Sequence, residues 1–166
     1  MSGGWPVVRT AQCWLPIVLC AGGLNGQTCL MLSRAAITSE GTALLDLYLF
    51  SPPNAAPAAL QWTFQYPPSG ITSLTVEDGA ELTSAGKTAI CAGDKTTYNC
   101  LAVGTNTNTI ANGIVAKLKV MLAPGTARPD IRIQNTQAAS SSGYFIPIRM
   151  SVDCRLHLPS RGPDAK

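Results

Sequence analysis

Strict alternation of apolar and polar residues is the feature that most constrains the fold of this chain. Within residues 58–66 an apolar row alternates with a polar row: Leu60, Trp62, Phe64 and Tyr66 against Gln61, Thr63 and Gln65. Successive side chains of a β-strand point to opposite faces, so a period of two places one row in a core and the other toward solvent. The segment therefore predicts a strand whose aromatic face is buried.

The same pattern returns along most of the chain, while helical periodicity is nearly absent. Turn residues such as Pro52-Pro53 and Asp78-Gly79 separate the apolar segments. Strands are predicted over residues 28–32, 43–50, 58–66, 71–76, 85–91, 98–103, 114–122, 131–134 and 145–152, with 138–143 as a loop. About nine short strands at this spacing predict an all-β fold, a two-sheet antiparallel sandwich.

The length and charge of the chain indicate one folded domain. Its 166 residues, 46% hydrophobic and 13% charged, are enough to bury one core. Lys and Arg number 12 against 9 Asp and Glu, and the basic residues are scattered along the chain. Nucleic-acid binders gather basic residues on one surface, so we exclude DNA and RNA as partners.

The N-terminal residues 1–26 have the features of a secretory signal peptide. Arg9 precedes an apolar segment at residues 13–21, and small and polar residues follow it. The apolar segment is shorter than the roughly 20 residues that span a membrane, and Pro16 interrupts it. A buried strand or an uncleaved anchor is the alternative interpretation of this segment.

A cleaved signal peptide implies a secreted, extracellular or cell-envelope protein that is not transmembrane after signal removal. The sandwich domain is then expected over residues 27–157. Residues 158–166 show no strand pattern and are expected to form a flexible tail.

The cysteines predict disulfide bonds. Of the six cysteines, four lie beyond the predicted signal peptide, and four allow three pairings. Cys91 and Cys100 flank a turn-rich stretch that would close a hairpin and place the two sulfurs opposite one another. Pairing these two leaves Cys29 with Cys154, which would tie the first strand of the sandwich to the last.

A zinc site is the alternative use of these cysteines. The sequence has no Cys-x2-Cys pair, and its one histidine, His157, lies near the predicted tail. We therefore expect no metal ion and no other cofactor.

The sequence contains no recognisable catalytic constellation. A nucleophile triad needs a histidine near Ser or Cys with an acid to orient it, and His157 is poorly placed for that role. Glu77, Asp78 and Glu81 gather around Gly79, where Asp and Gly suit the geometry of a turn. We interpret these acids as turn residues and predict that the protein is not an enzyme.

Two further motifs suggest ligands but fit local structure better. Residues 85–88, Ala-Gly-Lys-Thr, are similar to a fragment of a phosphate-binding loop, but the upstream glycine is missing at the required spacing. Asn106, Asn108 and Asn112 could offer oxygens to Ca²⁺, yet no acids accompany them. We interpret the three asparagines as parts of a polar turn.

The order of several short motifs resembles that of cohesin domains, especially the cohesin-like domains of exported bacterial proteins. The motifs are Gly41-Thr42 before a long strand, the strand 60–67 ending in Tyr-Pro, residues 76–79 after it, residues 112–118 with a Gly before a strand, and the closing strand 148–152. The resemblance covers nearly the whole chain after the predicted signal peptide. It implies a jelly roll whose first and last strands lie side by side, in agreement with a Cys29–Cys154 bridge.

The resemblance also implies a function. Cohesins bind dockerin modules through one flat face of the sandwich, so the implied partner is a dockerin-like protein. The residues implied for that face are solvent-side positions of two well-patterned strands: Gln61, Thr63, Gln65, Lys117 and Lys119. An ordinary polar surface would present the same residues. Pro67-Pro68 and the local cysteine pair depart from the family pattern.

Two other functions stay open. The sandwich architecture also serves carbohydrate-binding modules, which stack exposed aromatic rings on the sugars of a polysaccharide. Trp62 belongs to the core row, which leaves Tyr48, Tyr98 and Tyr144 as candidates, and Tyr48 is expected to pack in the core. The third interpretation is a disulfide-stabilised structural domain with no ligand of its own.

Overall fold

The computed structural model describes residues 27–150, which form eleven strands and one short helix. In chain order these are β1 (Thr28–Leu32), β2 (Ala36–Ile37), β3 (Thr42–Phe50), β4 (Ala59–Gln65), β5 (Ile71–Asp78), α1 (Ala80–Ser84), β6 (Thr88–Gly93), β7 (Thr97–Val103), β8 (Gly113–Leu122), β9 (Arg132–Ala139), β10 (Phe145–Ile146) and β11 (Ile148–Met150). The predicted signal peptide at 1–26, the predicted tail at 158–166 and Cys154 lie outside the described residues.

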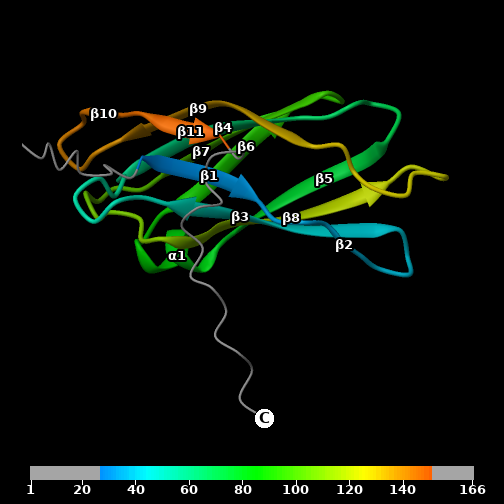
Figure 1. Cartoon of the computed structure of the whole chain (residues 1–166), viewed down its shortest axis with the longest axis horizontal. Coiled ribbons are helices and arrows are strands. Elements are labelled where there is room, and N and C mark those ends of the chain that lie inside the picture. Colours follow the sequence, from blue (N-terminus) through cyan, green and yellow to red (C-terminus); the bar gives the residue numbers. More distant parts are fainter. Residues whose placement is uncertain (1–26, 151–166) are drawn as a thin grey trace, which may run out of the picture.

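The strands form two sheets packed face to face (Figure 1). Sheet A has six strands in the order β11-β1-β3-β8-β5, with β2 beside β3, and sheet B has five in the order β10-β9-β4-β7-β6. The chain crosses repeatedly between the sheets, as in a jelly roll. The predicted two-sheet sandwich is confirmed.

The strand count exceeds the predicted one because short strands were not expected. β2 has two residues, and Pro147 divides the predicted strand 145–152 into β10 and β11. Proline has no N–H to give to a sheet, so it marks the point where the chain leaves one sheet. β10 pairs with β9 in sheet B, whereas β11 pairs with β1 in sheet A.

The pairing of β1 with β11 is parallel, an exception to the antiparallel pairing that the sequence predicted for the sandwich. These two strands run parallel, with Thr28 opposite Ile148 and Cys29 opposite Arg149. They lie side by side in Figure 1, as the resemblance implied. The Cys29–Cys154 bridge stays a prediction, because Cys154 is not among the described residues.

β9 is longer than the sequence indicated. It continues through residues 138–139, which were predicted as loop. Ala138 and Ala139 pair with Leu60 and Ala59 of β4, so the neighbouring strand extends the pairing past the end of the apolar pattern. Small residues give a weak strand signal by themselves.

The core lies between the inward rows of the two sheets. Leu60, Trp62 and Phe64 of β4 are each no more than 1% exposed, which confirms the predicted burial of the aromatic row. The rings of Trp62 and Phe64 pack edge to face, with centroids 6.3 Å apart and planes at 73°, a favoured aromatic geometry. Sheet A contributes Leu45, Leu47, Leu49, Val115, Leu118 and Val120 to the same cluster.

The single turn of α1 closes one end of the sandwich. A Cβ on Gly79, which precedes the helix, would lie 2.2 Å from the carbonyl oxygen of Ile114, so only glycine allows this close approach to β8. Leu82 of the helix is fully buried. No helix among residues 27–150 is long and apolar enough to cross a membrane.

The disulfide predicted between Cys91 and Cys100 is present, with an S–S distance of 2.08 Å. The two residues are direct partners in the β6–β7 pairing, and their Cα atoms are 4.1 Å apart. Cys100 is 1% exposed, so the bridge lies on the inward side of sheet B. The bridge links the edge strand β6 of sheet B to its neighbour β7.

Trp62 provides a test of the core. We expect Trp62→Ala to lower the free energy of unfolding by about 3–5 kcal/mol, because it leaves a large cavity. Trp62 Nε1 is buried and has no hydrogen-bond partner in the described structure, so Trp62→Phe removes an unsatisfied donor and should cost much less. Denaturant unfolding of both variants measures the difference, and equal losses would contradict this account of the core.

The hairpin disulfide should contribute to stability through the unfolded chain. Its cysteines are separated by 9 positions, and the chain-entropy model assigns a loop of this size about 2–3 kcal/mol. The double variant Cys91→Ala, Cys100→Ala should lose that amount in denaturant unfolding. An unchanged midpoint would mean that the hairpin is equally restricted without its bridge.

A non-reducing peptide map of the unaltered protein should also show Cys29 linked to Cys154.

Candidate functional site

The five residues predicted for a partner-binding face divide between the two sheets. Gln61, Thr63 and Gln65 lie on β4 in sheet B, whereas Lys117 and Lys119 lie on β8 in sheet A. The sheets pack through their inward rows, so their outward rows point in opposite directions. The prediction that these residues share one face is therefore wrong. Alternation shows which side chains leave the core, but it does not show which sheet a strand joins.

The outward side of sheet B, which we call the B face, is ordered in rows across its strands. One row runs through Ile90, Leu101, Gln61 and Gln137. The next contains Ala92, Asn99, Thr63 and Gln134. A third contains Thr97, Gln65 and Arg132. Apart from Arg132 at its end, these rows are made of amides, hydroxyls and apolar groups.

Hydrogen bonds fix the polar centre of the B face. Thr63 Oγ1 donates to Asn99 Oδ1 at 2.7 Å, and Gln134 Nε2 donates to Gln65 Oε1. Thr63 is only 4% exposed, so it orients Asn99 and offers little contact area of its own. Gln61 is half-buried and Gln65 is exposed. Of the three predicted residues on β4, these two glutamines are the ones a partner can touch.

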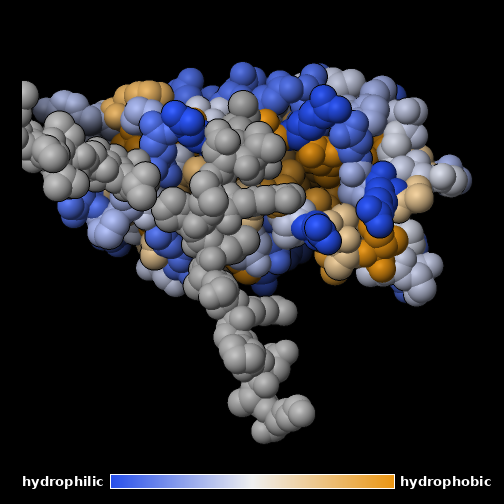
Figure 2. Space-filling model, in the orientation of Figure 1, coloured by the Kyte–Doolittle hydropathy of each residue, from blue (hydrophilic) through white to orange (hydrophobic). Residues whose placement is uncertain are grey.

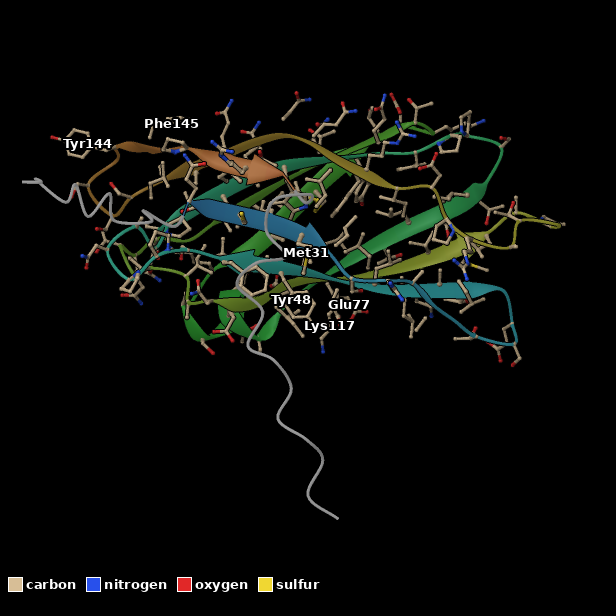
Figure 3. All side chains as sticks on the ribbon, viewed as in Figure 1. Met31, Tyr48, Glu77, Lys117, Tyr144 and Phe145 are labelled. Atoms are coloured by element: carbon tan, nitrogen blue, oxygen red, sulfur yellow. A yellow bond between two sulfur atoms is a disulfide. The ribbon has the colours of Figure 1, made fainter. Side chains whose placement is uncertain are left out.

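Apolar side chains that the sequence prediction missed lie toward one end of the B face. Ile90 is 63% exposed, Leu101 41% and Phe145 67%. Leu101 and Phe145 line a shallow depression of about 260 Å³ together with Gln61. Tyr144 stands beside Phe145 at the β10 end of the molecule (Figure 3). Aromatic and aliphatic anchors next to neutral polar groups are typical of protein interfaces.

One of these residues could have been found from the sequence. Cys91 turns inward to reach Cys100, and strand side chains alternate, so the preceding Ile90 has to face outward. No comparable signal exists for Phe145, because its direction depends on the change of sheet at Pro147.

Lys117 and Lys119 lie on the outward side of sheet A, which we call the A face. The register places Lys117 between Asp46 on β3 and Glu77 on β5. Opposite charges on neighbouring strands offset one another, which is usual for a solvated sheet surface. Figure 3 shows Lys117 and Glu77 on this side of the sandwich, away from Tyr144 and Phe145.

Tyr48 also lies on the A face, so the prediction that it packs in the core is wrong. Its ring is half-buried and stacks against Phe50, with centroids 6.1 Å apart and planes at 14°. Met31 of β1 is its partner across the strands. Apolar side chains also reach the surface around β2, where Ile37 and Leu44 are each 45% exposed (Figure 2).

The acids near Gly79 have structural positions. Asp78 Oδ1 accepts a hydrogen bond from the backbone N–H of Ala89 at 2.7 Å and so joins the end of β5 to β6. Glu77 faces outward on β5, and Glu81 lies on α1. In residues 27–150 no three His, Cys, Asp or Glu side chains are grouped so that they could hold a metal ion.

The asparagines and the lysine of the phosphate-loop-like fragment hold loops together. Lys87 Nζ donates to the backbone oxygen and Oδ1 of Asn106, at 3.1 and 3.2 Å. Asn106 Nδ2 in turn donates to the carbonyl oxygens of Ala85 and Gly86. Asn112 Oδ1 accepts from the backbone N–H of Ser51. These side-chain groups are engaged with the protein itself, in keeping with a polar turn.

The turn between β6 and β7 is organised by one carboxylate. Asp94 Oδ1 accepts hydrogen bonds from the backbone N–H and hydroxyl groups of Thr96 and Thr97. The bonds from Thr96, followed by those from Thr97, lower the pKa of Asp94 from its ordinary value of 3.8 to about 2. Tyr66 donates its hydroxyl to the backbone oxygen of Asp94 at 3.0 Å, and burial raises the pKa of that tyrosine.

Solved cohesin domains share this fold. The sixth cohesin of scaffoldin B from Acetivibrio cellulolyticus, solved in complex with a dockerin, has a TM-score of 0.64 at 9% identity and covers 76% of this chain and 95% of its own. A type I cohesin–dockerin complex from Clostridium thermocellum gives 0.62 at 14% identity, with 75% and 89% covered. A non-cellulosomal cohesin from the archaeon Archaeoglobus fulgidus gives 0.59 at 9% identity, with 76% and 87% covered.

These similarities concern the fold. No protein-family model matches the chain, and no curated protein matches it. The described residues therefore have a cohesin-like fold, as the order of sequence motifs implied, at a sequence identity of 9–14% to the three structures named above.

The Asp94 turn predicts a pH dependence of stability. A carboxyl whose pKa is lower in the folded state stabilises the fold above its unfolded pKa, and that contribution disappears as the pH falls through the folded pKa. For Asp94 the window runs from 3.8 down to about 2. Asp94→Asn keeps the side-chain shape without the titration, so its melting temperature should fall less steeply between these pH values. If the melting temperatures of the two proteins fall equally steeply over this pH range, the prediction is contradicted.

Proposed function

We propose that this protein is a non-catalytic, exported module that binds a protein partner of dockerin-like kind through its B face. The likeness in fold to cohesins solved in complex with dockerins supports a protein as the partner. The predicted signal peptide supports a location outside the cytoplasm. The observation that carries the choice of face is the set of exposed apolar side chains, Ile90, Leu101 and Phe145, beside an uncharged polar centre.

The B face is better suited than the A face to a folded partner. Charged residues are depleted in the centres of interfaces because each must lose its water on binding. The Thr63–Asn99 bond is already formed on the B face, so its polar centre is preorganised. Binding at the A face would bury Lys117 together with its neighbours Asp46 and Glu77. Replacing the hydration of such charges is costly unless every one finds a partner.

Leu101 and Phe145 have the most to gain from contact with a partner. They border the same depression, and both are exposed in this structure. Fully burying a Leu or Phe side chain contributes about 1.5–3 kcal/mol, and a few such anchors dominate the affinity of most interfaces. Gln61 lies between them and offers hydrogen bonds that fix orientation.

The proposal is tested by calorimetric titration with a recombinant dockerin-like module from the same organism. We expect the double variant Leu101→Ala, Phe145→Ala to weaken binding by about 100-fold, because it removes both apolar anchors. The matched control Lys117→Ala, Lys119→Ala alters the A face and should leave the affinity within about threefold of that of the unaltered protein.

Three outcomes would contradict the proposal. If the lysine variant alone loses binding, the partner uses the A face. If both variants bind as the unaltered protein does, neither face is used. If no dockerin-like module binds but the protein is retained on insoluble polysaccharide, the carbohydrate-binding function that the sequence left open replaces a protein partner.

A further inference from the structure

The residues of the edge strand β6 lack the charges and prolines that usually protect exposed sheet edges, and the neighbouring carboxylate of Asp78 covers the N–H of Ala89 near the start of the strand. An edge presents unpaired backbone N–H and C=O groups, which proteins shield with charges, prolines or very short strands. β6 (Thr88–Gly93) reads Thr-Ala-Ile-Cys-Ala-Gly, with neither charge nor proline. At the other described edges, β5 ends in Glu77-Asp78, β10 has two residues before Pro147, and β11 carries Arg149.

The lysine next to β6 does not shield this edge. Lys87 is only 4% exposed and its amino group is bound to Asn106, so its charge is turned into the loop. On β6 itself Ile90 is 63% exposed, and Ala92 and Gly93 are exposed as well. Beyond the N–H of Ala89, which Asp78 covers, the strand is therefore accessible and uncharged.

Two hydrogen bonds show which backbone groups of β6 point away from β7. The N–H of Asp94 donates to the carbonyl of Thr97 and closes the hairpin, while the N–H of Ala89 donates to Asp78 on the opposite side. Backbone groups alternate in direction along a strand, so Cys91 and Gly93 point the same way as Ala89. The N–H of Ala89 is already bound, which leaves its carbonyl and the groups of Cys91 and Gly93 facing outward.

These outward groups are complementary to themselves. We propose that two copies of this chain associate through antiparallel pairing of their β6 strands, with Cys91 of each copy opposite Cys91 of the other. The two Cys91 residues then exchange N–H···O=C bonds. The N–H of Gly93 donates to the free carbonyl of Ala89 in the second copy, and the carbonyl of Gly93 takes the place of Asp78 as acceptor for the N–H of Ala89. Pairing of like strands about a two-fold axis is the simplest closed association.

The side chains of β6 fit the same register. Ile90 of one copy lies opposite Ala92 of the other, so a large apolar side chain meets a small one and both lose exposed area.

The hairpin disulfide prepares β6 for this pairing. It holds Cys91 against Cys100, so the edge is ordered before a second copy arrives and less entropy is lost on association. The two-fold axis stands perpendicular to the joined sheets, which places both B faces on the same side. If the proposed function holds, the dimer presents two partner sites side by side and gains avidity for a repeated partner.

The test uses the full chain with its disulfide intact and without any partner protein, so its result is independent of the proposed function. Sedimentation velocity from micromolar to millimolar concentration should show a monomer–dimer equilibrium. In the same samples the amide hydrogens of Cys91 and Gly93 should exchange with solvent more slowly, by about tenfold or more, as the fraction of dimer rises. The amides of Ile90 and Ala92 already bond to β7 and should not change with concentration.

Two matched lysine variants separate edge pairing from packing of the B faces. Ile90→Lys puts like charges on the paired strands and should weaken self-association by about tenfold or more. Leu101→Lys adds the same charge in the same row on the neighbouring strand β7, and should leave self-association unchanged. A single monomeric species throughout, Cys91 and Gly93 amides that exchange independently of concentration, or equal loss in both variants would overturn the proposal. The exchange measurement needs no variant, so a folding defect in Ile90→Lys does not affect it.

Discussion

The burial of one apolar row from each sheet is the constraint on which the rest of the structure depends. Leu60, Trp62 and Phe64 of β4 enter the same cluster as the leucines of β3 and the inward residues of β8. Because side chains alternate along a strand, burying this row fixes the direction of every residue between its members. Because the aromatic row of β4 is buried in the core, the polar residues between its members point outward and form the polar centre of the B face.

The sequence allowed the strands to be predicted far better than the surface they form. A period of two depends only on neighbours along the chain, and the strands at 28–32, 43–50 and 114–122 agree closely with β1, β3 and β8. Sheet membership depends on contacts between distant segments, which no local pattern contains. The glutamines of β4 and the lysines of β8 look alike in the sequence, yet they lie on opposite sides of the molecule.

The residues that carry the proposed function also break the rule used to find strands. Ile90, Leu101 and Phe145 are apolar and exposed, whereas Thr63 is polar and 4% exposed. A pattern that assigns apolar residues to the core cannot identify outward anchors, and it assigns a polar residue to solvent even where neighbours cover it. Such exceptions are expected at functional surfaces, because binding a partner and filling a core require the same chemistry in different directions.

The parallel pairing of β1 with β11 also determines how the domain responds to mechanical force. A pull applied through the beginning of β1 and the end of β11 acts along both strands in opposite senses, because the two run in the same direction. The hydrogen bonds between them are then loaded in shear and must break together. In an antiparallel pair pulled from adjacent ends, the bonds would break one after another, like a zipper. The fold is thus suited to remain intact under tension between its first and last described strands.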